Sequence, residues 1–177
     1  MVSNRHDGTS VATPPRAGHG ATTGTGLVLL AVAGSILLLS GAFIFQAMGY
    51  APCKLCVWQR WPHAIAIVAG IAAVMLVGRP WLALGALAAA TTGALGIYHT
   101  GVERAWWPGQ DTCSAGPVGG LSTDALLDQI MAAPLVRCDE VAWAFAGLSM
   151  ASWNAILSFL IAAIWLCALW IGRRQAS

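Results

Sequence analysis

Four long apolar stretches divide the sequence, and none shows the alternation of polar and apolar residues that a half-buried strand requires. They cover residues 25–48, 61–77, 81–98 and 150–171. A bilayer core of about 30 Å is spanned by roughly 20 helical residues, and backbone groups inside it must pair without water. The pattern therefore predicts an all-α integral membrane protein, a four-helix transmembrane bundle in which residues 78–80 form a tight hairpin.

The segments outside these stretches have different patterns. Residues 1–24 are rich in Gly, Thr, Pro and Ala and lack periodicity, which predicts a disordered cytoplasmic tail before a single membrane domain of residues 25–177. An alternative is a signal peptide with residues 27–39 as its apolar core, but the apolar run continues beyond it. Residues 122–133 predict a short helix with one apolar face, which lies on the membrane surface or packs on the bundle.

Composition supports a membrane protein. Of 177 residues, 58% are hydrophobic and 9% are charged, against about 25% charged in an ordinary soluble domain. The mean hydropathy is +0.70. These values exclude a soluble globular enzyme and a disordered chain. The net charge of +2, without a basic cluster, gives no reason to expect a nucleic acid as partner.

The few charges are unevenly placed, and this predicts the orientation in the membrane. Residues 99–145 hold six acids and two bases, whereas arginines flank the other ends of the apolar stretches, at positions 5, 16, 79, 173 and 174. Positive residues remain on the cytoplasmic side, so we expect both termini there and the two cysteine-containing loops outside. Lys54 and Arg60 are exceptions to this rule.

Four of the five cysteines lie in the predicted outer loops. Cysteines exported to an oxidising compartment form disulfides, which suggests the pairs Cys53–Cys56 and Cys113–Cys138. The close Cys-x-x-Cys pair constrains the unfolded chain little and suits redox chemistry better than stabilisation, whereas the second pair suits either role. Cys167, inside the last stretch, is expected to act as a small apolar side chain. Only one close pair is present, so no zinc site is predicted.

Arg60 has an unusual position four residues after Cys56. The spacing places both side chains on one helix face, about one turn apart. An arginine at the mouth of a membrane helix is costly unless it has a partner or a task, and its donors suit a carbonyl or a developing oxyanion. The alternative is an arginine that reaches lipid phosphates. A helix that begins near Cys56 would favour a thiolate there.

Taken together, these residues resemble the disulfide bond formation protein B (DsbB) family over most of residues 25–172. Residues 51–60, APCKLCVWQR, are similar to the family's Cys-x-x-Cys and its arginine. Residues 98–103 leading to Cys113, and residues 138–154, are similar to the segments around its second cysteine pair. Gln59 stands where some relatives carry an acid, and the spacing of Cys113 and Cys138 is typical of a divergent bacterial branch.

The resemblance implies a thiol:quinone oxidoreductase of the bacterial inner membrane, with its redox loops in the periplasm. The partner would be a thioredoxin-like, DsbA-type oxidase, and the cofactor ubiquinone or menaquinone. The partner's thiolate would attack Cys113, and Cys138 would then exchange with the Cys53–Cys56 pair. Cys56 would face the quinone, with Arg60 and His99 as further quinone-binding residues.

The sequence is also compatible with three other functions. An enzyme resembling vitamin K epoxide reductase also couples a Cys-x-x-Cys to a quinone, but its motif lies in a late helix, whereas Cys53 and Cys56 precede the second apolar stretch. A non-catalytic membrane protein with two structural disulfides is the second alternative. The third is a metal-binding membrane protein, in which His63 or His99 would join the cysteines.

Overall fold

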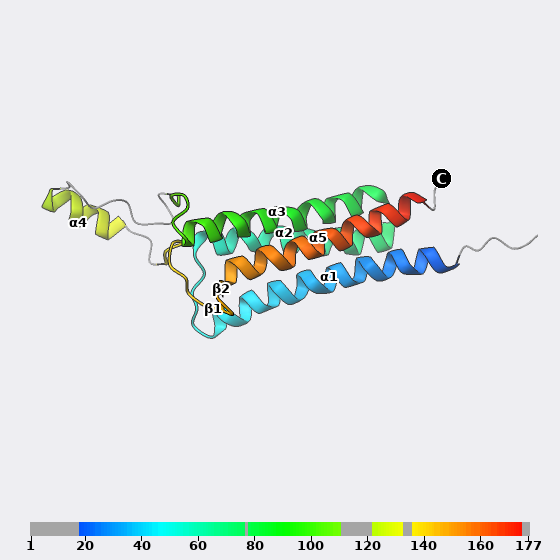
Figure 1. The fold of residues 1–177 in the computed structure, drawn as a ribbon, viewed down its shortest axis with the longest axis horizontal. Coiled ribbons are helices and arrows are strands. Elements are labelled where there is room, and N and C mark those ends of the chain that lie inside the picture. Colours follow the sequence, from blue (N-terminus) through cyan, green and yellow to red (C-terminus); the bar gives the residue numbers. More distant parts are fainter. Residues whose placement is uncertain (1–17, 77, 111–121, 133–135, 175–177) are drawn as a thin grey trace, which may run out of the picture.

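The protein is described by a computed structural model that covers residues 18–76, 78–110, 122–132 and 136–174. Its long helices are α1 (Gly18–Ala47), α2 (Lys54–Leu76), α3 (Arg79–Glu103) and α5 (Met150–Arg174), and each is long and apolar enough to cross a membrane. They run side by side (Figure 1), with α1 and α3 each packed against both α2 and α5. The predicted four-helix membrane bundle is confirmed.

The bundle has two different ends. The loop between α1 and α2 and the long connection between α3 and α5 lie at one end, called the loop end below (Figure 1). The opposite end, called the turn end, carries Gly78 between α2 and α3, together with the first residue of α1 and the last of α5. Residues 53 and 56 and residue 138 all belong to the loop end, as the charge pattern predicted for the two cysteine loops.

The helices are longer than the apolar stretches that revealed them. α2 begins at Lys54 rather than at residue 61, and α3 continues to Glu103 rather than ending at residue 98. The first turns of α1 cover residues 18–24, which the sequence pattern assigned to the tail, while residues 1–17 of that tail lie outside the described residues. A helix needs apolar side chains only where it crosses lipid, so polar turns extend it at both ends.

Small residues bring α3 and α5 close together. A Cβ atom added at Gly96 would lie 2.9 Å from the backbone nitrogen of Ala155, so the two backbones approach too closely for any other residue. Nearby, the ring of Trp165 is fully buried against Gly85. Such contacts through small residues are typical of helix pairs in membranes. Large apolar side chains point outward instead, among them Val68, Met75 and Leu87.

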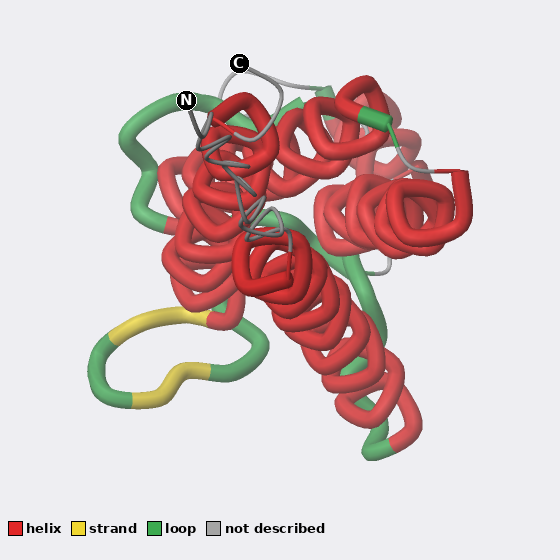
Figure 2. Tube along the Cα trace, turned by 90° about the vertical axis from the view of Figure 1, so that its right-hand side faces the viewer, coloured by secondary structure: helices red, strands yellow, loops and turns green. Residues whose placement is uncertain are grey.

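A small hairpin precedes α5 and was not predicted from the sequence. Strands β1 (Ala144–Phe145) and β2 (Leu148–Ser149) pair antiparallel, with Ala144 opposite Ser149. The two connecting residues, Ala146 and Gly147, have φ values of 51° and 76°, as the tight two-residue hairpin turn requires. The hairpin lies at the edge of the bundle (Figure 2). Strands of two residues are too short to show the alternation of polar and apolar residues by which a strand is predicted.

Helix α4 (Thr123–Ala132) confirms the short helix predicted between the third and fourth spans. It lies beyond the loop end, apart from the four long helices (Figure 1). Its apolar residues Leu127, Ile130 and Met131 are 61%, 61% and 82% exposed. The expectation that this face packs on the bundle is therefore wrong, and its location on a membrane surface stays a prediction.

Candidate active site

The Cys-x-x-Cys motif forms the first turn of α2. Cys53 immediately precedes the helix, and its carbonyl accepts the first helical hydrogen bond, from the amide of Val57. The Cys53 sulfur caps the turn as well, because the backbone amide of Cys56 donates to it at 3.3 Å. Cys56 thus lies at the amino end of a long helix, where the helix dipole stabilises negative charge.

Cys53 and Cys56 are both free thiols, with their sulfurs 3.0 Å apart. The disulfide predicted for this pair is therefore not formed in the structure, which holds it as a dithiol. The Cys53 thiol donates to the Cys56 sulfur. This hydrogen bond and the burial of Cys53, which is 4% exposed, raise the pKa of the Cys53 thiol. When the pair loses one proton, the negative charge consequently resides on Cys56.

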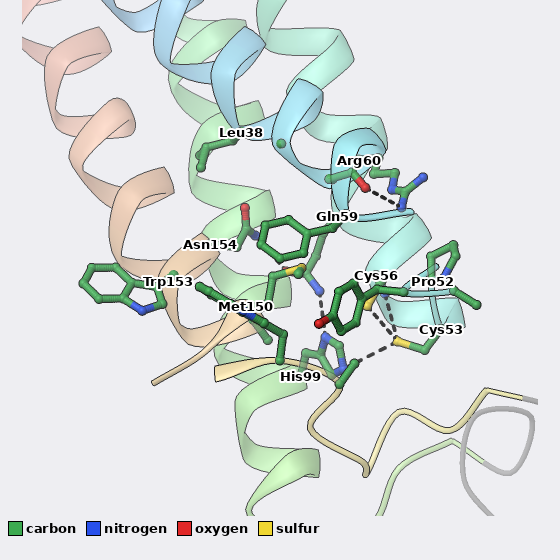
Figure 3. A pocket seen from close by; sticks show the side chains of 18 of the residues that line it. Leu38, Pro52, Cys53, Cys56, Gln59, Arg60, His99, Met150, Trp153 and Asn154 are labelled. Carbon is green, nitrogen blue, oxygen red and sulfur yellow. Dashed lines mark hydrogen bonds between the residues drawn. The ribbon is translucent and has the colours of Figure 1, made fainter. Parts of the chain in front are cut away.

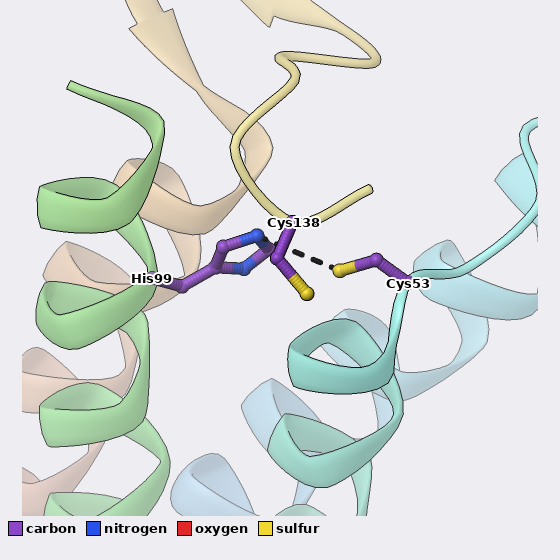
Figure 4. A group of neighbouring side chains, drawn as sticks. All are labelled: Cys53, His99 and Cys138. Atoms are coloured by element: carbon purple, nitrogen blue, oxygen red, sulfur yellow. Dashed lines mark hydrogen bonds between the residues drawn. The ribbon is translucent and has the colours of Figure 1, made fainter. Parts of the chain in front are cut away.

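Cys138, from the loop before the hairpin, lies next to Cys53. The sulfurs of Cys53 and Cys138 and a ring nitrogen of His99 all lie within 4.8 Å of one another, and the three side chains converge in Figure 4. All three residues are buried. Cys138 is disulfide-bonded. Its predicted partner, Cys113, lies outside the described residues.

Cys53, His99 and Cys138 are also the group of described residues that most resembles a metal site. A metal ion requires deprotonated thiolate or neutral imidazole ligands, and a structural zinc site uses four of them. The sulfur of Cys138 is already in a disulfide, which leaves Cys53 and His99 as ligands in this state. The arrangement therefore fits thiol chemistry better than metal binding. The prediction that the protein needs no metal stays a prediction.

A salt bridge holds the loop that carries Cys138. Arg137 donates to both carboxylate oxygens of Asp139, at 3.0 and 2.6 Å, and lies 3.5 Å from Glu140. The guanidinium lowers the pKa of Asp139, and the carboxylate raises the pKa of Arg137. Arg137 and Asp139 are the two neighbours of Cys138 in the chain, so this bidentate pair limits the backbone conformations of Cys138.

His99, from α3, is 3% exposed and has partners on both ring nitrogens. Its Nε2 lies 3.5 Å from the sulfur of Cys53 and 3.9 Å from a carboxylate oxygen of Glu103, one turn further along α3. Its Nδ1 lies 2.9 Å from the amide nitrogen of Gln59. Glu103 also accepts a hydrogen bond from Ser149, the last residue of β2. His99 thus lies beside Cys53, and its predicted role in binding a quinone stays a prediction.

Arg60 lies one turn deeper than Cys56, as predicted, and contacts α1. Its guanidinium donates to the side-chain oxygen of Gln46 at 2.6 Å and to the carbonyl of Ala42 at 3.5 Å, and it lies 4.8 Å from the centre of the Phe43 ring. These partners are neutral, so they leave its positive charge uncompensated. Its Nε is buried and has no hydrogen-bond partner among the described residues.

A second group of polar residues lies between α2, α3 and α5, with Gln59, His63 and Thr92 buried and Asn154 half-buried. The side chain of Asn154 donates to Gln59 at 2.7 Å and accepts from His63 at 3.0 Å, and Thr92 donates to the Gln59 carbonyl at 3.0 Å. In the sequence pattern Gln59 is only a departure from the family, and Asn154 and Thr92 are not among the predicted site residues. Their signal was available, because a polar residue in a membrane helix usually has a specific task.

A cavity of about 460 Å³ lies at the loop end, between α1, α2, α3 and α5 (Figure 3). Cys53, Cys56, Arg60 and His99 contribute to its wall. Most of the remaining wall is apolar or aromatic and includes Leu37, Leu38, Phe45, Tyr50, Trp143, Met150 and Trp153. A flat, mostly apolar molecule with a few polar atoms matches such a wall. The cavity was not predictable from the apolar pattern.

Comparisons with known proteins agree with this geometry. The family model "Disulfide bond formation protein DsbB" matches residues 24–168. Disulfide bond formation protein B of Verminephrobacter eiseniae is 28% identical over 159 residues, which cover 85% of this chain and 88% of that protein. The protein of the same name from an Azoarcus species is 32% identical over 150 residues, or 78% and 86% of the two chains. No solved structure gives a significant match.

Proposed function

The chain belongs to the DsbB family of membrane disulfide bond formation proteins, and from this we propose that it oxidises a thioredoxin-like dithiol protein and passes the electrons to a membrane quinone. One observation carries the proposal. The sulfur of Cys53 lies within 4.8 Å of that of Cys138 on one side and 3.0 Å from that of Cys56, in the cavity wall, on the other. Cys53 thus links an outer loop to a cavity between membrane helices.

The proposed electron path consists of balanced exchanges between dithiols and disulfides. The two thiols of a DsbA-type partner become a disulfide as the Cys113–Cys138 disulfide is reduced to two thiols. These two thiols are reoxidised when the Cys53–Cys56 disulfide is reduced. Each exchange transfers two electrons and two protons, and each begins with thiolate attack on a sulfur. The free thiols of Cys53 and Cys56 beside a disulfide-bonded Cys138 correspond to the stage at which electrons have reached the inner pair.

The residues around the cavity fit a quinone. A bound quinone supplies an acceptor for the two electrons and two protons of the inner dithiol. The apolar wall suits its ring and tail. Arg60 has neutral acceptors around its charge and a buried Nε that finds no partner within the part of the chain that the structure describes. Arg60 would donate to a quinone oxygen and stabilise negative charge there. His99 would contact the quinone from the side of the sulfurs.

The charge distribution supports a location in the bacterial inner membrane with the loop end in the periplasm. Arg79, Arg173 and Arg174 lie at the turn end, which we assign to the cytoplasm together with both termini. The disulfide of Cys138 agrees with an oxidising compartment at the loop end. Labelling of intact cells with a membrane-impermeant maleimide, using single cysteines placed at Gly78 and at Gly109, would test this orientation. Labelling at Gly78 and not at Gly109 would reverse it.

The alternatives receive less support. Structural disulfides alone do not explain why the Cys53–Cys56 pair is a dithiol beside a cavity. An enzyme resembling vitamin K epoxide reductase would carry its motif in a late helix, whereas here the motif begins α2.

The proposal is tested with purified protein, a reduced DsbA-type partner and a ubiquinone or menaquinone analogue. Quinone reduction, followed by absorbance, should accompany partner oxidation, followed by thiol alkylation. Cys56→Ser and Cys113→Ser should abolish quinone reduction and the catalytic turnover of the partner. Cys167→Ser is the matched control, since Cys167 is a free, exposed thiol outside the cavity wall, and should keep full turnover. Full turnover in Cys56→Ser or Cys113→Ser would overturn the mechanism.

A further inference from the structure

The side-chain amide of Gln59 is held in one orientation. Its nitrogen lies 3.1 Å from the backbone carbonyl of Leu55 and 2.9 Å from Nδ1 of His99. A carbonyl oxygen only accepts hydrogen bonds, so the atom facing Leu55 must be the NH₂ group. A flipped amide would bring two oxygens together at this buried position, where Gln59 is 6% exposed. Gln59 therefore donates one hydrogen to Leu55 and the other to His99.

Asn154 reinforces this orientation from α5. Its amide nitrogen lies 2.7 Å from the side-chain oxygen of Gln59 and 3.4 Å from the backbone carbonyl of Thr92. The carbonyl of Thr92 identifies the nitrogen of Asn154, just as that of Leu55 identifies the nitrogen of Gln59. The opposite atom of Asn154, its oxygen, accepts from Ser158 at 3.3 Å. Asn154 thus donates to the oxygen of Gln59.

These orientations determine the tautomer of His99. Because Gln59 donates to Nδ1, that nitrogen must carry the lone pair, and in a neutral ring the proton is then on Nε2. Nε2 lies 3.5 Å from the sulfur of Cys53. Two other acceptors face the ring and are compatible with a proton on Nε2. A carboxylate oxygen of Glu103, the one further charged group there among the described residues, lies 3.9 Å from Nε2, and the backbone of Cys138 also hydrogen-bonds the ring.

We propose that Gln59 and Asn154 are positioning residues that lock His99 in its Nε2-protonated tautomer, so that the imidazole donates to Cys53 and Cys53 in turn donates to Cys56. Asn154, Gln59, His99, Cys53 and Cys56 then form one row, called the polar row below, in which every donor faces the same way. The row ends on the Cys56 sulfur and stabilises its thiolate. Only the use of that thiolate to reduce a quinone rests on the proposed function.

The tautomer is read directly by nitrogen NMR of the reduced protein labelled with ¹⁵N-histidine, with His99→Asn used to assign the signal. We expect wild-type His99 to carry its proton on Nε2. In Gln59→Glu a carboxylate faces Nδ1 and can only accept, so Nδ1 should become protonated. Asn154→Asp removes the donor that orients Gln59 and should shift His99 the same way, which keeps the test available if a Gln59 variant fails to fold. A proton on Nδ1 in the wild type, or an unchanged tautomer in both variants, overturns the proposal.

The stabilisation of the Cys56 thiolate is measured by the rate at which iodoacetamide modifies Cys56 at neutral pH. Trypsin cleaves after Lys54 and Arg60, so mass spectrometry of the 55–60 peptide reports on Cys56 alone. A hydrogen bond contributes about 0.5–1.5 kcal/mol, so Gln59→Leu should slow the reaction by roughly 2- to 12-fold. Thr91→Ala is the control, because the Thr91 hydroxyl donates to the Leu87 carbonyl within α3 and lies outside the polar row. An unchanged rate in Gln59→Leu contradicts the proposal.

Neither measurement requires quinone or partner protein. If wild-type protein fails to reduce quinone but shows the expected tautomer and alkylation rates, the proposed function is wrong and the polar row stands. If turnover is normal but His99 carries its proton on Nδ1, the polar row is wrong and the proposed function stands.

Discussion

The guanidinium of Arg60 lies 2.6 Å from the side-chain oxygen of Gln46 and thereby joins α2 to α1 beside the cavity. Gln46 is the one strongly polar residue in the first apolar stretch, and it is itself exposed. The contact directs the arginine toward α1 without neutralising it, since an amide oxygen carries no charge. Arg60 therefore keeps its positive charge and a spare buried donor at the cavity wall.

Arg60→Met should weaken the use of quinone while leaving thiol exchange intact. A hydrogen bond to a charged group contributes about 1.5–3 kcal/mol, so the KM for quinone should rise by roughly 10- to 150-fold. Exchange between the two cysteine pairs, measured by trapping disulfides with acid and mass spectrometry, should continue at the wild-type rate. Arg79→Met, at the turn end, is the control. An unchanged KM would remove Arg60 from the quinone site.

Gln46→Leu should have a smaller effect in the same direction. The substitution keeps Arg60 and its charge but removes the acceptor that holds the guanidinium against α1. The loss of a single hydrogen-bond partner suggests a rise in KM of about 3- to 10-fold. The double variant with Arg60→Met should be no worse than Arg60→Met alone, because Gln46 acts through Arg60. Additive effects of the two substitutions would show that Gln46 contributes independently.

Much of this architecture was predictable from the sequence, because the protein folds in a lipid bilayer. Lipid forces backbone groups to pair within each span, so the apolar stretches alone predicted four helices and one cysteine-rich end. The contacts of Arg60 with Gln46 and of Gln59 with Asn154 were not predictable. They join residues 14 and 95 positions apart, and depend on how each helix is rotated about its axis. A helix that is apolar on most sides carries little periodicity to reveal that rotation.

Gly96→Ala should destabilise the bundle. The added Cβ would lie 2.9 Å from the backbone nitrogen and 3.0 Å from Cβ of Ala155, and a backbone atom cannot move away as a flexible side chain can. Overpacking of this kind costs about 1–3 kcal/mol. The control is Gly26→Ala on α1, where the new Cβ meets nothing within 4 Å and should be neutral or slightly stabilising. Thermal unfolding in detergent should give a lower Tm for Gly96→Ala alone, and equal Tm values would contradict the close approach of α3 and α5.

The protein in which Cys53 and Cys56 are reduced should become less stable as the pH rises above about 8.5. This value is the ordinary pKa of a cysteine in an unfolded chain, about 8.5. Folding raises the pKa of Cys53, because its thiol donates to Cys56 and is buried. Above pH 8.5 the unfolded chain has therefore lost a proton that the folded protein still holds. Fewer protons bound in the unfolded state means that the free energy of unfolding decreases with pH, by up to about 1.4 kcal/mol per pH unit for one group.

Unfolding by urea at several alkaline pH values measures this slope. Cys53→Ser removes the titrating thiol and should flatten the curve relative to reduced wild type. Cys167→Ser keeps Cys53 and should retain the slope, since Cys167 is exposed on α5. Oxidised protein with a Cys53–Cys56 disulfide should lose the slope too, because neither sulfur then titrates. A slope that persists in Cys53→Ser would mean that another group holds the proton, and the hydrogen bond from Cys53 to Cys56 would not be its cause.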